Sequence, residues 1–169
     1  SPGGMGGPGG MGGMNDGNSE KGDHSAKGIK AGNAILVSSG TVAVKSYDDA
    51  LHANGGETLE NGETSLGTVT VTGGTLTLFS KDDGIHGDGT VTISGGSVRV
   101  SGSYEGIEGA VVEISGGNLS VISTDDGING TATSGTGIRI TGGTLYVLAG
   151  GDGLDSNSRD TYGGISFEG

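Results

Sequence analysis

The chain has 169 residues, including 41 Gly and no Cys, and its 20 acidic against 8 basic residues give a formal net charge of −12. This charge argues against nucleic acid and anionic membranes as partners and favours cations or ligands bridged by cations. The lack of Cys excludes disulfides and thiolate chemistry, and no apolar run is long enough to predict a transmembrane segment.

Residues 1–24 are rich in Gly, Met and Pro, then in polar residues, and show no apolar alternation. We expect a linker or flexible N-terminal segment here, followed by one repetitive domain over residues 25–169. An acidic domain without Cys and rich in Thr, Ser and Gly is typical of exported bacterial proteins. Because no signal peptide is present, we expect a mature form or a fragment of a longer protein.

The repeats are marked by a tripeptide that we call the station, which holds a polar residue, a small residue and then Ile or Leu. The stations are Lys27-Gly28-Ile29, Asp49-Ala50-Leu51, Asp83-Gly84-Ile85, Glu105-Gly106-Ile107, Asp126-Gly127-Ile128 and Asp152-Gly153-Leu154. Their last residues are 22, 34, 22, 21 and 26 residues apart. A base period of 21 to 22 residues predicts an all-β solenoid in which each repeat is one coil.

Each station is expected to be a short strand, followed by two strands that a Gly-Gly pair separates. Alignment on these pairs gives four aliphatic columns: Ile35, Val69, Val91, Val112 and Ile138; Val37, Val71, Ile93, Ile114 and Ile140; Val42, Leu76, Val98, Leu119 and Leu145; and Val44, Leu78, Val100, Val121 and Val147. A slip by one residue would turn them all outward, so the pattern predicts the register. The two longer steps predict insertions within residues 53–67 and 130–137, either as part of a binding face or as tolerated surface loops.

Acids recur at the stations of five successive coils. Parallel strands would stack them about 4.8 Å apart, where two carboxylates repel by about 3 kcal/mol at an effective dielectric of 20. One hypothesis is that Ca²⁺, which takes six to eight oxygen ligands, lies among them; the other is that each Asp caps its own turn. Mg²⁺ suits such a site less because it retains water, and the scarcity of His and absence of Cys argue against zinc.

Other polar side chains lie near the stations. His52 and His86 fall one coil apart and are predicted to be metal ligands, an acid–base pair or, as we favour, a surface hydrogen-bond ladder. Tyr residues offer faces for sugar stacking, but they lie in different columns, which favours ordinary packing or surface positions. The candidates for additional ligands or sugar contacts are His52, Asn54, His86, Asp88, Asn129, Tyr47 and Tyr104.

The strings KGIKA, DDALHA, DDGIH, YEGIEG and DDGIN, in this order over residues 25–157, resemble a carbohydrate-binding family found on the surface of anaerobic bacteria that degrade plant cell walls. The resemblance implies a right-handed parallel β-helix similar to that of pectate lyases, Ca²⁺ held between coils, binding of cellulose-like and pectic polysaccharides, and secretion to the bacterial cell surface. The metal ligands that it implies are Asp48, Asp49, Asp82, Asp83, Glu105, Glu108, Asp125, Asp126, Asp152 and Asp155. The first station departs from the pattern with Lys27 and Lys30, so we expect no calcium there and expect the ammonium groups to neutralise the next acid.

A pectate lyase also needs an Arg or Lys base beside its calcium. Here the neighbouring columns hold acids, His and Asn, and the nearest basic residue is Lys81. A hydrolase would need two carboxyl groups in unequal environments, for which the pattern gives no sign. We therefore predict a non-catalytic, calcium-dependent module that binds cellulose-like glycans and polygalacturonate. The alternatives are a calcium-dependent pectate lyase and a structural or adhesive surface solenoid that calcium stabilises.

Overall fold

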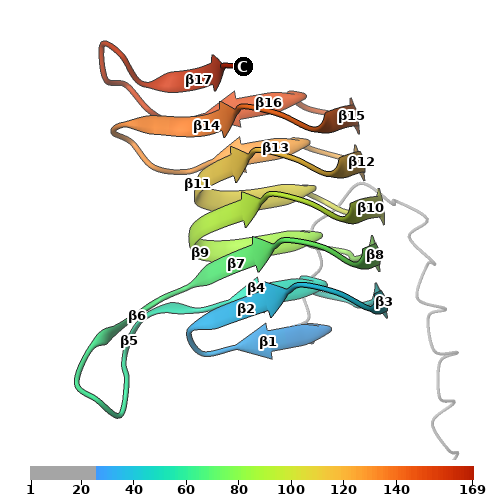
Figure 1. The fold of residues 1–169 in the computed structure, drawn as a ribbon, viewed down its shortest axis with the longest axis vertical. Helices are drawn as coiled ribbons and strands as arrows, with labels where there is room; N and C mark the ends of the chain where they lie inside the picture. Colours follow the sequence, from blue (N-terminus) through green and yellow to red (C-terminus); the bar gives the residue numbers. More distant parts are fainter. Residues whose placement is uncertain (1–25) are drawn as a thin grey trace, which may run out of the picture.

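The computed structural model describes residues 26–169, and this part of the chain is all-β, with seventeen strands and no helix (Figure 1). The predicted N-terminal linker, residues 1–24, lies outside the described residues. In chain order the strands are β1 (Ile29–Ala31), β2 (Ala34–Val37), β3 (Thr41–Lys45), β4 (Leu51–Ala53), β5 (Gly55–Thr58), β6 (Thr64–Leu66), β7 (Thr68–Val71), β8 (Thr75–Phe79), β9 (Ile85–Ile93), β10 (Ser97–Gly102), β11 (Ile107–Ile114), β12 (Asn118–Ser123), β13 (Ile128–Gly130), β14 (Thr136–Ile140), β15 (Thr144–Ala149), β16 (Leu154–Ser156) and β17 (Gly164–Phe167).

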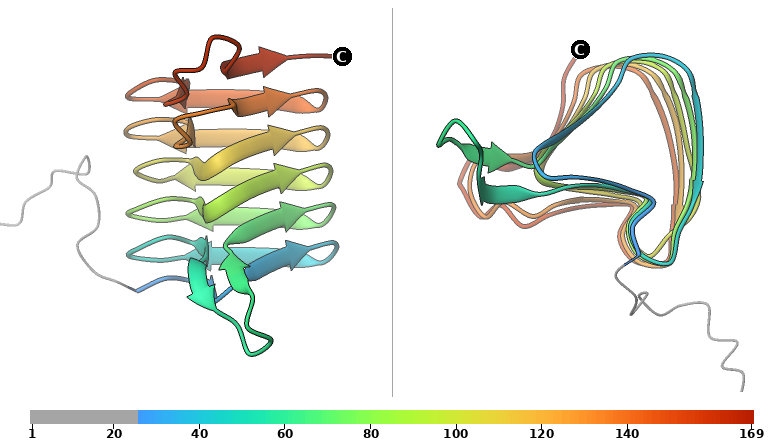
Figure 2. Two further views of the ribbon diagram at one scale, coloured as in Figure 1. Left: turned by 90° about the vertical axis from the view of Figure 1, so that its left-hand side faces the viewer. Right: turned by 90° about the horizontal axis from the view of Figure 1, so that it is seen from below.

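The strands form two large parallel sheets. One has ten strands and follows the order β1-β4-β9-β11-β13-β16, with β2, β7, β14 and β17 paired beside this path. The other has five strands in the order β15-β12-β10-β8-β3. Each strand lies beside its equivalent in the next repeat, so successive turns of the chain stack, and they nearly superpose in the view along the stack (Figure 2).

The predicted register is confirmed. The last station residues pair in sequence, from Ile29 with Leu51 to Ile128 with Leu154. The four aliphatic columns pair as aligned, for example Val69 with Val91. This follows from the period of two along each strand and the period of 21 to 22 between strands, which the sequence carries together.

The stacked aliphatic columns form the core. Leu51, Leu78, Ile107 and Ile128 are among those with no exposed surface, and burial of such a side chain contributes about 1.5–3 kcal/mol. Residues of the same columns in the end coils are only partly buried: Ile35, Val37, Val42, Val44, Ile140, Leu145, Val147 and Leu154. The end coils have a neighbour on one side only, so the middle of the stack is the best-packed part.

The prediction of three separate strands in every coil is wrong for two coils. In β9 and β11 the station strand continues into the next strand, and β11 shifts its register between Gly109 and Val111. No insertion separates the two strands in these coils, and each has a paired coil on both sides, whereas β1 and β2 of the equally short first coil stay separate at the end of the stack.

The insertions lie where the sequence predicts, between the station strand and the strand that follows it. The first forms an antiparallel hairpin of β5 and β6, which projects from the stack (Figure 2). The second, between β13 and β14, has no strand of its own. The hairpin brings the backbone N–H of Gly55 close to Asp88 on β9.

The small middle residue of the station faces the core at close quarters. A Cβ on Gly106 would overlap Val121 Cγ1 and the carbonyl oxygen of Gly127, and one on Gly84 would lie 2.7 Å from Val100 Cγ1. In the second coil the middle station residue is Ala50. The residue of that coil in register with these valines is Leu78. Gly is therefore required wherever a β-branched Val fills the space, and Ala is accommodated in the coil that has Leu.

Candidate functional site

The side chains after the stations point away from the core because successive strand residues face opposite sides. The register puts Lys30, His52, His86, Glu108, Asn129 and Asp155 side by side in one outward column. The station acids and the acids before them lie next to this column. We call the combined set the acid ladder: Asp48, Asp49, His52, Asp82, Asp83, His86, Glu105, Glu108, Asp125, Asp126, Asn129, Asp152 and Asp155.

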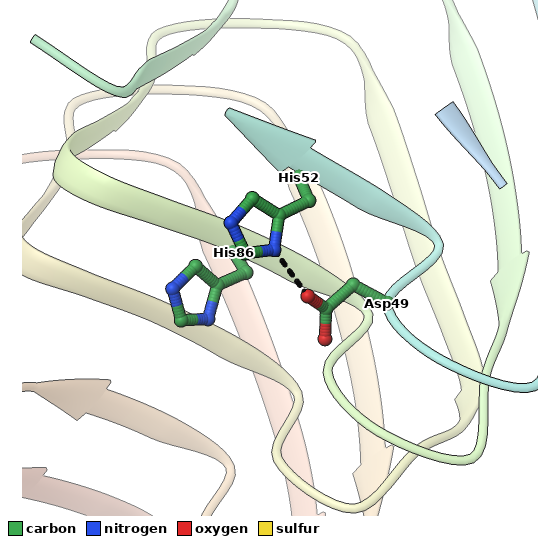
Figure 3. A group of neighbouring side chains, drawn as sticks. All are labelled: Asp49, His52 and His86. Atoms are coloured by element: carbon green, nitrogen blue, oxygen red, sulfur yellow. Dashed lines mark hydrogen bonds and ion pairs between the residues drawn. The ribbon is translucent and has the colours of Figure 1, made fainter. Parts of the chain in front are cut away.

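Two imidazoles stack in the ladder. The His52 and His86 ring centroids are 4.3 Å apart with an interplanar angle of 12° (Figure 3). Each ring is held by the acid three residues before it: His52 Nδ1 bonds Asp49, and His86 Nδ1 lies 2.7 Å from Asp83 Oδ2. The two coils thus repeat one Asp–His unit, which gives the hydrogen-bonded ladder favoured from the sequence.

Asp88 links both imidazoles to the hairpin. Its Oδ1 lies 3.4 Å from His52 Nε2 and 3.0 Å from His86 Nε2, while its Oδ2 accepts the Gly55 N–H at 2.9 Å. Burial acts to raise the pKa of Asp88, but the Gly55 N–H and the His86 ring outweigh it and hold this pKa below its usual value. Asp88 is therefore an anion held between the hairpin and both rings.

Lys27 neutralises the first acids, as the sequence predicts. Its Nζ lies 2.7 Å from Asp48 Oδ2 and 3.8 Å from Asp49 Oδ2, and all three side chains are at most 15% exposed. Burial acts to raise the pKa of Asp48, but the hydrogen bonds from Lys27 and from the Asp49 N–H, with the Lys27 charge, together outweigh it and lower this pKa. Lys30 lies exposed at the end of the outward column.

Removing this ammonium group should leave a buried acid without its counter-charge. We expect Lys27→Met to lower the free energy of unfolding by about 1.5–3 kcal/mol, the usual contribution of a hydrogen bond to a charged group. In a double-mutant cycle measured by denaturant unfolding, adding Asp48→Asn should recover part of this loss. Strictly additive effects of the two substitutions would contradict the pairing.

Raised pKa values reduce the negative charge in the middle of the ladder. Burial raises the pKa of Asp83 to about 7, and burial together with Glu108 raises the pKa of Glu105 to about 9. Burial acts to lower the pKa of His86, but hydrogen bonds to Asp83 and Glu108 outweigh it and raise this pKa to about 11. Asn129 Nδ2 donates to Glu108 Oε2 at 3.1 Å. Hydrogen bonds to His86 and Asn129, together with the raised pKa values, therefore reduce the repulsion among Asp83, Glu105 and Glu108.

The C-terminal part of the ladder differs. No Lys, Arg or His within residues 26–169 makes an ion pair with Asp125, Asp126, Asp152 or Asp155. A Cβ on Gly151 would lie 2.6 Å from both Asp125 Oδ1 and Asp126 Oδ1, so these two oxygens approach one point. Burial, followed by the neighbouring carboxylates, raises the pKa of Asp126 against the effect of the Asp152 N–H. Four acids are thus gathered here without an organic cation from the described chain.

The acids also accept hydrogen bonds from backbone N–H groups. Capping of the local turn was the alternative to calcium binding that the sequence left open. Asp48 Oδ1 accepts the N–H of Asp49, within its own turn. In contrast, Asp49 Oδ1 accepts the Asp83 N–H at 3.0 Å, and Asp126 Oδ1 accepts the Asp152 N–H at 2.8 Å. Capping of the local turn therefore describes Asp48, whereas Asp49 and Asp126 join one coil to the next.

Some atoms of the ladder suit a metal ion. Asp83 Oδ1 and Asn129 Oδ1 are buried without a hydrogen-bond partner in the described part of the chain. Three groups have potential ligand atoms within 4.8 Å of one another: Asp49, His52 and His86; Asp83, His86 and Glu108; and Asp48, Asp49 and Asp82. The donors are mostly carboxylate and amide oxygens, which is the chemistry that Ca²⁺ prefers.

The aromatic candidates Tyr47 and Tyr104 lie in different columns, as the sequence indicates, and line two neighbouring pockets. Tyr47 lines a pocket with Lys45, Phe79 and Lys81, and Tyr104 lines a neighbouring pocket that shares Phe79 and Lys81. Lys45 Nζ and Lys81 Nζ lie 5.2 and 5.7 Å from the Phe79 ring centroid. Residues in different columns meet because each third strand ends in a turn towards the next station.

Sequence reasoning missed Phe79. A signal was present, since Phe79 pairs with Lys45 across the coils and is followed directly by Ser80 and Lys81. Asn54, in contrast, begins the hairpin, where its N–H donates to Ala31 O, and no described interaction joins its side chain to the ladder.

Comparison with known proteins gives one family. A family model described as carbohydrate-binding domain-containing protein matches residues 9–69, which is less than half of the chain. Searches of the curated proteins and of the solved structures found no match. Within residues 26–169, no helix has the length and apolar character required to cross a membrane.

Proposed function

We propose that this chain is a non-catalytic polysaccharide-binding module whose stacked turns form a right-handed parallel β-helix. The family match over residues 9–69 supports carbohydrate binding, and the near-universal right-handedness of parallel crossover connections supports the handedness. The proposal includes secretion to a bacterial surface and plant cell-wall glycans as ligands, in keeping with the family resemblance of the station strings.

Calcium dependence is carried by one observation, the uncompensated acids at the C-terminal end of the ladder. Asp125, Asp126, Asp152 and Asp155 would hold Ca²⁺ between two coils, because hard oxygen ligands from adjacent coils suit this ion. Calcium bound there removes the repulsion among the acids and offers coordination positions to sugar hydroxyls and uronate carboxylates. In the first coils, the Lys27 ammonium group already serves as a counter-ion, and His52 and His86 hydrogen-bond to the station acids.

The glycan would lie along the stack over the two neighbouring pockets. These pockets combine the Tyr47, Phe79 and Tyr104 rings with the Lys45 and Lys81 ammonium groups, in a chain that is otherwise strongly acidic. Aromatic faces bind sugar rings and ammonium groups bind carboxylates, so this surface suits an acidic linear glycan such as polygalacturonate. Lys81, the nearest candidate for a lyase base, contributes to this surface and lies over the Phe79 ring.

Binding to insoluble cellulose and to polygalacturonate, with and without calcium, tests the proposal. We expect the wild type to bind polygalacturonate without releasing unsaturated, ultraviolet-absorbing products. Lys45→Gln with Lys81→Gln should weaken this binding by at least about tenfold, which corresponds to 1.4 kcal/mol. The control, Lys30→Gln, changes an exposed Lys outside the pockets and should leave the affinity unchanged.

The other outcomes separate the alternatives. Release of unsaturated products would support a pectate lyase. A protein that calcium stabilises but that retains no glycan would support a structural or adhesive solenoid. Either result would overturn the binding-module proposal.

A further inference from the structure

We propose that His52, His86 and Asp88 form a binding site for one transition-metal ion of the zinc class. The ligand atoms would be Nε2 of both imidazoles and Oδ1 of Asp88. This site lies at the hairpin end of the ladder and shares no residue with the calcium site proposed for Asp125, Asp126, Asp152 and Asp155.

The distances from Asp88 Oδ1 to the two rings are close to those between the ligands of a zinc ion. Asp88 Oδ1 lies 3.4 Å from His52 Nε2 and 3.0 Å from His86 Nε2. Bond lengths of about 2.0–2.2 Å to tetrahedral zinc place neighbouring ligand atoms about 3.3 Å apart. Both distances from Asp88 Oδ1 are therefore near the required separation. The stacked rings, whose centroids lie 4.3 Å apart, must tilt towards each other for their Nε2 atoms to converge on the ion.

Buried carboxylates hold both rings in the orientation that a metal needs. Asp49 accepts from His52 Nδ1 and Asp83 from His86 Nδ1, and each carboxylate is only 4% exposed. Histidine ligands usually donate their second ring N–H to such a group, which fixes the tautomer and aims the other nitrogen at the metal. The near-parallel stacking of the rings brings both Nε2 atoms to the same side (Figure 3).

The hairpin completes the site. The Gly55 N–H binds Asp88 Oδ2 and so leaves Oδ1 turned towards the rings. Asp88 is 39% exposed, which gives an ion access from solvent and leaves room for water as a fourth ligand. The ion replaces the proton on His86 Nε2, which passes to solvent, and the acids around the ring attract the dication as they attract that proton.

Two imidazoles with one carboxylate favour zinc, nickel or copper over calcium and magnesium. The scarcity of His in the sequence argued against zinc, but two of the three His in the chain converge at this one place. The sequence placed His52, His86 and Asp88 among the candidate ligands, but it could not show that the inserted hairpin holds Asp88 through the Gly55 N–H.

Titration of the untagged, chelator-stripped chain with Zn²⁺ in excess Ca²⁺ tests the site by calorimetry. We expect one Zn²⁺ per chain, and Co²⁺ in its place should give the visible absorption of a four-coordinate site. Asp88→Asn and His52→Gln should each weaken Zn²⁺ binding by at least about tenfold, and Asp49→Asn by about 10–100-fold. Asp155→Asn, which changes an acid of the outward column in the calcium site, should leave the Zn²⁺ affinity within twofold.

Thermal melting of each metal-free variant shows that it is folded before titration. The proposal is overturned if the wild type binds no Zn²⁺ in excess calcium, or if Asp88→Asn binds it like the wild type. Loss of binding in Asp49→Asn alone would also overturn it, because that result places the ion on the Nδ1 side of the rings. None of these results depends on glycan binding, so this site and the proposed function fail separately.

Discussion

Replacing Gly106 by Ala should lower the free energy of unfolding by about 1–3 kcal/mol, the usual cost of overpacking a core. The added methyl group would overlap Val121 Cγ1 and the Gly127 carbonyl oxygen, which belongs to the next coil. The backbone would have to move in two coils that also carry ladder acids. Denaturant unfolding of the metal-free protein measures the effect directly.

Gly153→Ala is the matched control, since Gly153 occupies the same station position in the last coil. Its added Cβ would meet no atom within 4 Å, and neither glycine has a positive φ. We expect a change within about 0.5 kcal/mol or a slight stabilisation. Equal destabilisation by both substitutions would contradict the packing argument.

The second coil indicates a second substitution that should restore stability. There Ala50 packs in a coil that has Leu78 where the Gly106 coil has Val121, so Gly106→Ala combined with Val121→Leu should recover part of the lost stability. A γ-branched side chain leaves free the space that the β-branched Val121 fills near the station. If the double variant is no more stable than Gly106→Ala, the pairing of these two columns is incorrect.

Calcium should stabilise the protein by about 2.7 kcal/mol at a free concentration one hundred times its dissociation constant, because the proposed site exists only in the folded ladder. Asp126→Asn with Asp155→Asn should remove most of this gain. Asn keeps an oxygen that can accept the Asp152 N–H, so the substitution tests the charge and not the hydrogen bond. Thermal melting with and without calcium gives the comparison.

The control for this experiment is Glu113→Gln, which removes a negative charge from an exposed position on β11. It should retain the full calcium effect. If it loses as much of the effect as the Asp126 and Asp155 variant, calcium acts through the overall charge of the chain and not through the proposed site.

The arrangement of the coils could be predicted because two periods are written into the sequence. Alternation along each strand fixes which face is buried, and the spacing of the stations fixes which residues pair. The stacking of His52 on His86 and the pairing of Lys27 with Asp48 both follow from this register. Such features need only backbone geometry.

Apart from Lys27, the distribution of basic side chains along the ladder could not be predicted in the same way. The sequence distinguishes only the first station, whereas the structure also places His52 and His86 against the acids of the next two coils and leaves the last acids without a basic side chain from residues 26–169 as partner. The position of Asp88 depends on the inserted hairpin, whose Gly55 lies 33 residues earlier. The pockets around Phe79 depend on turns that bring different columns together.

The most direct test is the calcium dependence of glycan binding, measured by calorimetry with a polygalacturonate fragment. The metal-free protein should bind at least about tenfold more weakly than the calcium-loaded protein, and added calcium should restore both affinity and melting temperature. An affinity that is the same in chelator and in calcium would contradict a calcium-dependent polysaccharide-binding module.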